Sequence, residues 1–363
     1  MKYKLLFLIT ILSIVAGTLF FAKRTPANKA LETPQKEAVQ AAILTPTRSI
    51  AKSPEAFEIP HKKQVFQSFN NCGPAILAMA LAYLDVDVSQ ETLGEKLRPY
   101  QIPNGDNDDK SVTFEEFAEE VKNYNLTAYH RPNGSVEKLQ KLVSNGFPVL
   151  VRTWLHPNED IGHYRLIRGF DNSTQEIIQD DSYEGPRLRY SYLTFSEMWK
   201  PFNYEYIVLT DKKREPLLRQ ILGEEVSEKK AWENALAKAK AEVPQEGEIP
   251  YSLFNQAVAD YHLGNFDEAI LLYEQIKRQL PPRMLWYQIE PIQALAQTNR
   301  FDQAHEEITA ILFNNNLAFT ELYVIQGEMY EKQGQLEEAK ASYEQAVRFN
   351  IHNKQAQDAL RQK

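Results

Sequence analysis

The sequence predicts an α+β domain over residues 59–213, followed by an all-helical repeat domain over residues 214–363. The first observation is a small, apolar run that begins at Cys72 and suits a buried helix. The second is a series of strand-like runs from residue 148 onward. The third is a motif that recurs every 35 residues, starting at positions 264, 299 and 334, as expected of stacked helix pairs.

The composition agrees with ordinary globular domains and narrows the possible partners. Of the 363 residues, 43% are hydrophobic and 25% are charged, so the chain has enough apolar material for packed cores. The formal net charge is -8. A general nucleic-acid-binding protein needs a basic face to neutralise phosphates, so we expect no nucleic-acid partner.

Residues 1–24 predict a membrane segment. Lys2 and Lys4 precede Leu5–Ala22, an uncharged apolar run of 18 residues. At about 1.5 Å per residue, such a helix spans most of a ~30 Å hydrocarbon core. A cleaved signal peptide is the alternative, but the end of the run lacks a small-x-small cleavage site, which favours an uncleaved signal anchor. We expect a single-pass protein whose remaining residues are extracytoplasmic, or a secreted protein if the segment is cleaved.

Local signals predict the elements that follow in order. Residues 25–58 contain several prolines and no persistent period, which indicates a flexible linker. In the α+β domain, a helix follows Cys72, a capping box at Thr113–Glu116 opens a second helix, and Thr194 caps a short one. The helices are predicted at 72–84, 113–124 and 135–144, and the strands at 148–155, 163–170, 176–181 and 204–210.

The C-terminal region predicts tetratricopeptide-like repeats. Gly264–Ala269, Asn299–Ala304 and Gly334–Ala339 share one pattern, in which a turn residue precedes an alanine that allows close helix packing. A helix over residues 231–243 is expected to precede the array. The segment 282–291 replaces a regular first helix, and its Trp286 and Tyr287 suit either the repeat core or a ligand groove. Repeats of this kind form concave surfaces that bind proteins or peptides.

Cys72 is the single cysteine of the chain. It cannot form an internal disulfide, so its thiol is either a small buried hydrophobe or a chemical group. A helix start presents N–H groups and a partial positive charge, which favour the nucleophilic thiolate. Gly73 is expected to leave room beside the sulfur for a substrate carbonyl, and Gln67 could donate to a developing oxyanion.

A cysteine nucleophile needs a base and a residue that orients the base. His163 begins a strand that is central to the predicted sheet, and the next strand ends at Asp180 and Asp181. A turn near residue 172 brings these positions together. Neighbouring strand residues point to opposite faces, so only one of the two aspartates can orient the imidazole.

These residues resemble cysteine peptidase family thirty-nine over residues 59–210. The resemblance rests on Gln67, on the string Asn70–Ala75, on Gly162-His163 and on the aspartate at the end of the next strand. It implies a papain-like fold with Cys72 as nucleophile, His163 as base, Asp181 as orienting acid and Gln67 in the oxyanion site. Ser182 replaces the family's usual proline, which leaves Asp180 as the alternative to Asp181.

The resemblance implies a bacterial thiol peptidase that acts on a peptide or protein. Together with the apolar N-terminal run and the repeats, we expect a membrane-anchored enzyme whose repeats bind a protein partner. Two alternatives remain: a non-catalytic scaffold for protein binding, and an enzyme that uses the same nucleophile on a non-peptide. No cofactor or metal is expected. The acidic stretch 105–110 lacks the ligand spacing and closing Glu of an EF-hand, so a solvated loop is favoured over a calcium site.

Overall fold

The computed structural model describes residues 49–99, 112–242, 249–314 and 316–362. The predicted membrane segment, most of the predicted linker and the acidic stretch 105–110 lie outside the described residues. Within the described residues, no helix combines the length and apolar character needed to cross a bilayer. These residues all fall in one compact unit.

The α+β domain is built around a mostly buried antiparallel sheet. Its seven strands run in the order β2-β7-β3-β4-β5-β6, with β1 added beside β4. The central strand β4 is buried over nearly its whole length because it has neighbours on both sides and helices on both faces. The strands are β1 Ala56–Glu58, β2 Thr127–Arg131, β3 Val149–Trp154, β4 Gly162–Asp171, β5 Glu176–Asp181, β6 Gly185–Ser191 and β7 Tyr206–Thr210.

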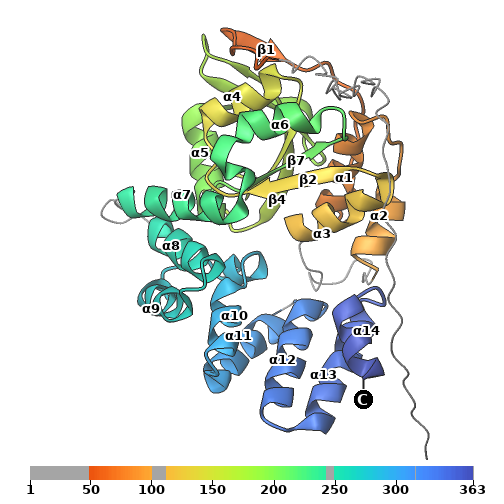
Figure 1. The fold of residues 1–363 in the computed structure, drawn as a ribbon, viewed down its shortest axis with the longest axis vertical. Coiled ribbons are helices and arrows are strands. Elements are labelled where there is room, and N and C mark those ends of the chain that lie inside the picture. Colours follow the sequence, from red (N-terminus) through yellow and green to blue (C-terminus); the bar gives the residue numbers. More distant parts are fainter. Residues whose placement is uncertain (1–48, 100–111, 243–248, 315, 363) are drawn as a thin grey trace, which may run out of the picture. The chain divides into compact units, whose positions relative to one another are not determined.

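Helices cover the two faces of this sheet in two groups (Figure 1). One group packs on the face that carries Leu150 and Leu166, and the other on the face that carries Val149 and Ile167. The first group is α1 Cys72–Ala82, α2 Gln90–Leu97 and α3 Phe114–Glu120, which continues as η1 Val121–Tyr124. The second group is α4 Val136–Ser144, α5 Tyr192–Trp199 and α6 Glu215–Leu222. The predicted α+β class is confirmed, and alternating strand side chains explain why each face has its own apolar core.

The structure adds α2, β2 and β6, which the sequence did not predict, and it corrects the predicted elements at three places. Residues 56–58 belong to the predicted linker but pair with β4 as a strand. Helix α6 was assigned to the repeat domain, yet its apolar face, including Leu218, packs into the core of the α+β domain. Ser191, rather than Thr194, caps α5, because the Ser191 hydroxyl accepts the backbone N–H of Thr194.

The remaining helices form an all-helical array, as predicted (Figure 1). Gly264, Asn299 and Gly334 all adopt left-handed backbone angles, so each ends the first helix of a pair in the same way. The alanines of the three motifs, at 269, 304 and 339, are fully buried. The helices are α7 Glu228–Ala241, α8 Tyr251–His262, α9 Phe266–Ile276, α10 Glu290–Gln297, α11 Phe301–Phe313, α12 Thr320–Lys332, α13 Leu336–Phe349 and α14 Lys354–Arg361.

A shared apolar core joins the array to the α+β domain. Trp154, Met198 and Phe202 of the domain are buried in the same cluster as residues of the repeats. The side chain of Gln288 donates a buried hydrogen bond of 2.8 Å to the carbonyl of Pro201. The short segment η3 Gly223–Val226 continues from α6 toward α7. The two parts therefore meet through packed side chains as well as through the chain connection.

Candidate active site

Cys72 is the first residue of α1, as the sequence predicts. Asn71 precedes the helix, and its buried side-chain amide donates to the backbone and side-chain oxygens of Gln90. These bonds fix the chain just before the cysteine. Cys72 is half-buried and lines a cavity of about 400 Å³.

Gly73 has a packing role that the sequence does not reveal. The residue is buried, and a Cβ at this position would lie 3.3 Å from both Phe117 and Val112. A side chain at this position would press against the core that covers the helix. The room that Gly73 leaves for a substrate carbonyl stays a prediction.

His163 lies beside both Cys72 and Asp181. Its Nε2 is 3.0 Å from each carboxylate oxygen of Asp181, and both side chains are buried. The other ring nitrogen, Nδ1, is left for the hydrogen bond between His163 and Cys72. Arg165 pairs with Asp181 in the sheet register, which places His163 on the same face at the diagonal position.

The two aspartates at the end of β5 have separate partners. Asp181 contacts His163 and also accepts the backbone N–H groups of Tyr183 and Glu184. Asp180 points to the other face, where its carboxylate lies 2.7 Å from Arg168 Nε and 2.8 Å from His61 Nδ1. Of the two, Asp181 is the one that can orient the imidazole.

Contacts within the site shift the pKa values of Cys72, His163 and Asp181. Burial alone raises the pKa of the Cys72 thiol, but the hydrogen bond and charge of His163 and the charge of Arg98 lower it below its usual value. Burial lowers the pKa of His163, whereas Asp181 and Cys72 raise it above its usual value. Burial also opposes the charge on Asp181, but His163 and Arg165 hold its pKa at about 2.

Gln67 lines the same cavity and is bound to the residue after Asp181. Its backbone N–H donates to the carbonyl of Ser182, and its side-chain Oε1 accepts the Ser182 hydroxyl at 2.9 Å. Because Oε1 faces Ser182, the amide nitrogen is the end that can donate into the cavity. Ser182 thus orients Gln67, a contact that the sequence alone did not reveal.

Two aromatic residues of the repeat array complete the lining of this cavity. Trp286 and Tyr287 lie in and after the short helix η4 Met284–Trp286 and line the cavity together with Cys72. The Tyr287 ring packs on Gly162, where a Cβ would come within 2.7 Å of it. The same two residues also belong to the shared apolar core, which confirms the core interpretation, while a ligand groove stays a prediction.

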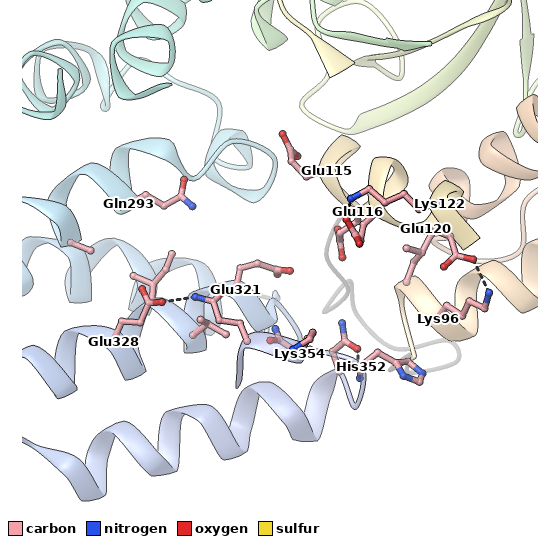
Figure 2. A pocket seen from close by; sticks show the side chains of 18 of the residues that line it. Lys96, Glu115, Glu116, Glu120, Lys122, Gln293, Glu321, Glu328, His352 and Lys354 are labelled. Atoms are coloured by element: carbon pink, nitrogen blue, oxygen red, sulfur yellow. Dashed lines mark hydrogen bonds and ion pairs between the residues drawn. The ribbon is translucent and has the colours of Figure 1, made fainter. Parts of the chain in front are cut away.

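A second cavity, of about 700 Å³, has no lining residue in common with the cavity of Cys72 (Figure 2). Its walls come from α2 and α3 on one side and from α10 and α12 on the other. Charged groups dominate the lining, and Figure 2 shows Lys96 paired with Glu120 there. Cys72, His163 and Asp181 do not line this cavity, so it is separate from the candidate site. In the described part of the chain, no cluster of His, Cys, Asp and Glu side chains could hold a metal ion.

Comparisons with known proteins agree with both parts of the chain. Residues 57–207 match the Peptidase_C39 like family, and residues 251–281 and 320–350 match tetratricopeptide repeats. No curated protein matches the chain. Several solved structures are similar to it, three of which are described here. A C39-like peptidase from Bacillus anthracis is 18% identical over 44% of this chain and 99% of that one, with a TM-score of 0.34.

The second structure is the peptidase domain of Streptococcus ComA, a bifunctional ABC transporter involved in a quorum-sensing pathway. It is 19% identical over 42% of this chain and 100% of that one, with a TM-score of 0.33. The third is the MamA RS-1 ArsTM double mutant, which is 18% identical over 39% of this chain and 79% of that one, with a TM-score of 0.33.

Proposed function

We propose that this chain, whose residues 57–207 form a C39-like peptidase domain, is a cysteine peptidase that hydrolyses a peptide bond. The observation that carries the proposal is the hydrogen-bonded arrangement of Cys72, His163 and Asp181 at one cavity. A nucleophile, a base and an orienting carboxylate in this order suit acyl transfer through a thioester. The lowered pKa of Cys72 beside the raised pKa of His163 favours the thiolate–imidazolium pair.

In the proposed reaction, the Cys72 thiolate attacks the carbonyl carbon of the scissile bond, and an oxyanion forms. The Gln67 amide nitrogen and the backbone N–H of Cys72 at the helix start donate to this oxyanion. The C–N bond then breaks as His163 gives its proton to the leaving amine, and a thioester remains. A water molecule, deprotonated by His163, attacks the thioester and releases the acid and the thiolate.

A thiol-directed acyl probe tests the proposal in the full chain. We expect the probe to label the protein through Cys72, and Cys72→Ala to abolish the labelling. His163→Ala should slow the labelling strongly because the thiol then loses the partner that lowers its pKa. An unlabelled wild-type protein, or equal labelling of wild type and His163→Ala, would refute catalysis.

A scaffold without turnover is the second candidate function, and the tetratricopeptide repeats favour it because such arrays bind proteins. Two variants separate the candidates in cells. If Cys72→Ala keeps the cellular phenotype while deletion of residues 249–350 abolishes it, the scaffold is the function. If Cys72→Ala alone abolishes the phenotype, the peptidase is.

The proposal includes a location outside a bacterial membrane, with Leu5–Ala22 as the anchor. The support is the apolar run itself, with Lys2 and Lys4 before it. We expect the protein to sediment with membranes and to be digested by a protease added outside intact spheroplasts. Full protection from that protease would contradict the proposed orientation.

A further inference from the structure

The cavity beside Cys72 is built from both parts of the chain. Phe69, Ile161 and Tyr183 line it from the peptidase domain, while Trp286 and Tyr287 line it from the repeat array. Both repeat residues lie between α9 and α10, where the repeat pattern departs from its regular form. The irregular segment therefore faces the candidate nucleophile.

Contacts with the peptidase domain hold this segment in place. Arg283 makes an ion pair of 2.5 Å with Asp160, and the Tyr287 ring packs edge-on against Trp154 with centroids 5.8 Å apart. Trp286 is 5% exposed, so its position is determined by packing. The wall that these residues form is a defined surface rather than a loose loop.

The mouth of the cavity exposes large apolar side chains. Phe69 is 50%, Ile161 44% and Tyr183 62% exposed, although side chains of this size are normally buried. Exposed apolar side chains gathered around one cavity mark a binding surface. Of the described residues that line the cavity, none is an aspartate or glutamate. Such a surface suits an apolar group better than a basic one.

We propose that Trp286 and Tyr287 are specificity-determining residues of the peptidase. Together with Phe69 and Tyr183 they form an aromatic pocket for a large apolar side chain next to the scissile bond of an extended peptide. The inference rests on the proposed function. According to this inference, the repeat array contacts the substrate directly through Trp286 and Tyr287, and its other surfaces remain available for partners.

A mixture of peptides with systematically varied residues, incubated with the full chain and analysed by mass spectrometry, tests the pocket. We expect the wild type to prefer a large apolar residue beside the cleaved bond. In Trp286→Ala and Tyr287→Ala, the ratio of kcat/KM for such peptides over matched alanine peptides should fall about tenfold, mainly through KM. A cleaving wild type without this preference, or an unchanged ratio in both variants, would overturn the inference.

A matched pair of milder variants controls for folding. Trp232 is buried in the repeats, stacks on His262 at 3.8 Å and does not line the cavity. Trp286→Phe should lower the preference for large apolar residues, whereas Trp232→Phe should leave it unchanged. Equal changes in the two variants would overturn the inference, because they would indicate a general effect of disturbing the repeat core.

Alkylation of Cys72 by iodoacetamide separates this inference from the proposed function. A reagent this small tests the thiol without using an aromatic pocket. If Trp286→Ala or Tyr287→Ala changed the alkylation rate of Cys72 by the same factor as the peptide selectivity, the aromatic residues would act through the nucleophile. That result would overturn the proposed pocket. A wild type that reacts with iodoacetamide and acyl probes at the rate of an ordinary thiol and cleaves no peptide would overturn the proposed function, and the inference with it.

Discussion

At the scale of the residue, Cys72 and His163 shift each other's pKa in opposite directions. The thiol, usually near 9.0, has a lowered pKa, and the imidazole, usually near 6.5, has a raised one. The thiolate is therefore present at pH values where an ordinary cysteine is protonated, and it is lost as pH falls through the lowered pKa. His163 stays protonated until pH rises through its raised pKa.

The rate of iodoacetamide alkylation as a function of pH measures this shift. We expect the rate in the wild type to rise at a pH below the usual thiol pKa of 9.0. His163→Ala removes the lowering contribution of the imidazole, so the rise should move to higher pH. An identical midpoint in wild type and variant would contradict the pairing of the two side chains.

Asp181 and Asp180 should respond differently to the same substitution. Asp181→Asn removes the charge that holds the imidazolium, so kcat should fall by about 100-fold or more while the fold is kept. Asp180→Asn breaks a buried pair with Arg168 and should lower the free energy of unfolding by about 3 kcal/mol. Peptide cleavage and urea denaturation of both variants check the contrast. Equal losses of kcat in the two folded variants would show that the adjacent carboxylates are not functionally distinct.

At the scale of the element, the start of β4 depends on the repeat segment. Gly162 precedes His163, and the Tyr287 ring occupies the space that a side chain at position 162 would need. Gly162→Ala should therefore lower the free energy of unfolding by about 2 kcal/mol. In the Tyr287→Ala background the same change should cost much less, because the ring is gone. Urea denaturation of the wild type, the two single variants and the double variant gives the coupling free energy between positions 162 and 287. If the two losses of unfolding free energy simply added, the contact would be contradicted.

At the scale of the whole molecule, the shared apolar core should make the two parts unfold together. Phe202 of the α+β domain lies in the core shared with the repeats, and its ring centroid is 6.0 Å from that of Tyr287. Interfaces that are apolar and closely packed suppress independent domain motion. We expect a single heat-absorption transition in calorimetry, and Phe202→Ala should lower its midpoint. Two transitions in the wild type, of which Phe202→Ala affects one, would show that the parts unfold independently.

The sequence by itself determined the features that depend on neighbouring residues. Strand-like runs predicted β3, β4, β5 and β7, Thr113–Glu116 predicted the start of α3, and the spacing of 35 residues predicted the repeats. The helix start at Cys72 is likewise a local property, since Pro74 suits a first turn and the following residues are small and apolar. Such signals act within one turn or one strand, so they can be read without knowing what packs nearby.

The tertiary structure decided the features that depend on distant residues. Which aspartate meets His163 follows from the register between β4 and β5, and a shift of one residue would exchange Asp180 for Asp181. The place of α6 in the core of the α+β domain depends on the sheet face that its apolar side covers. Trp286 and Tyr287 reach the cavity of Cys72 only because the repeat array packs against the α+β domain. No pattern in 282–291 encodes that contact, because its partners lie far from this segment in the sequence.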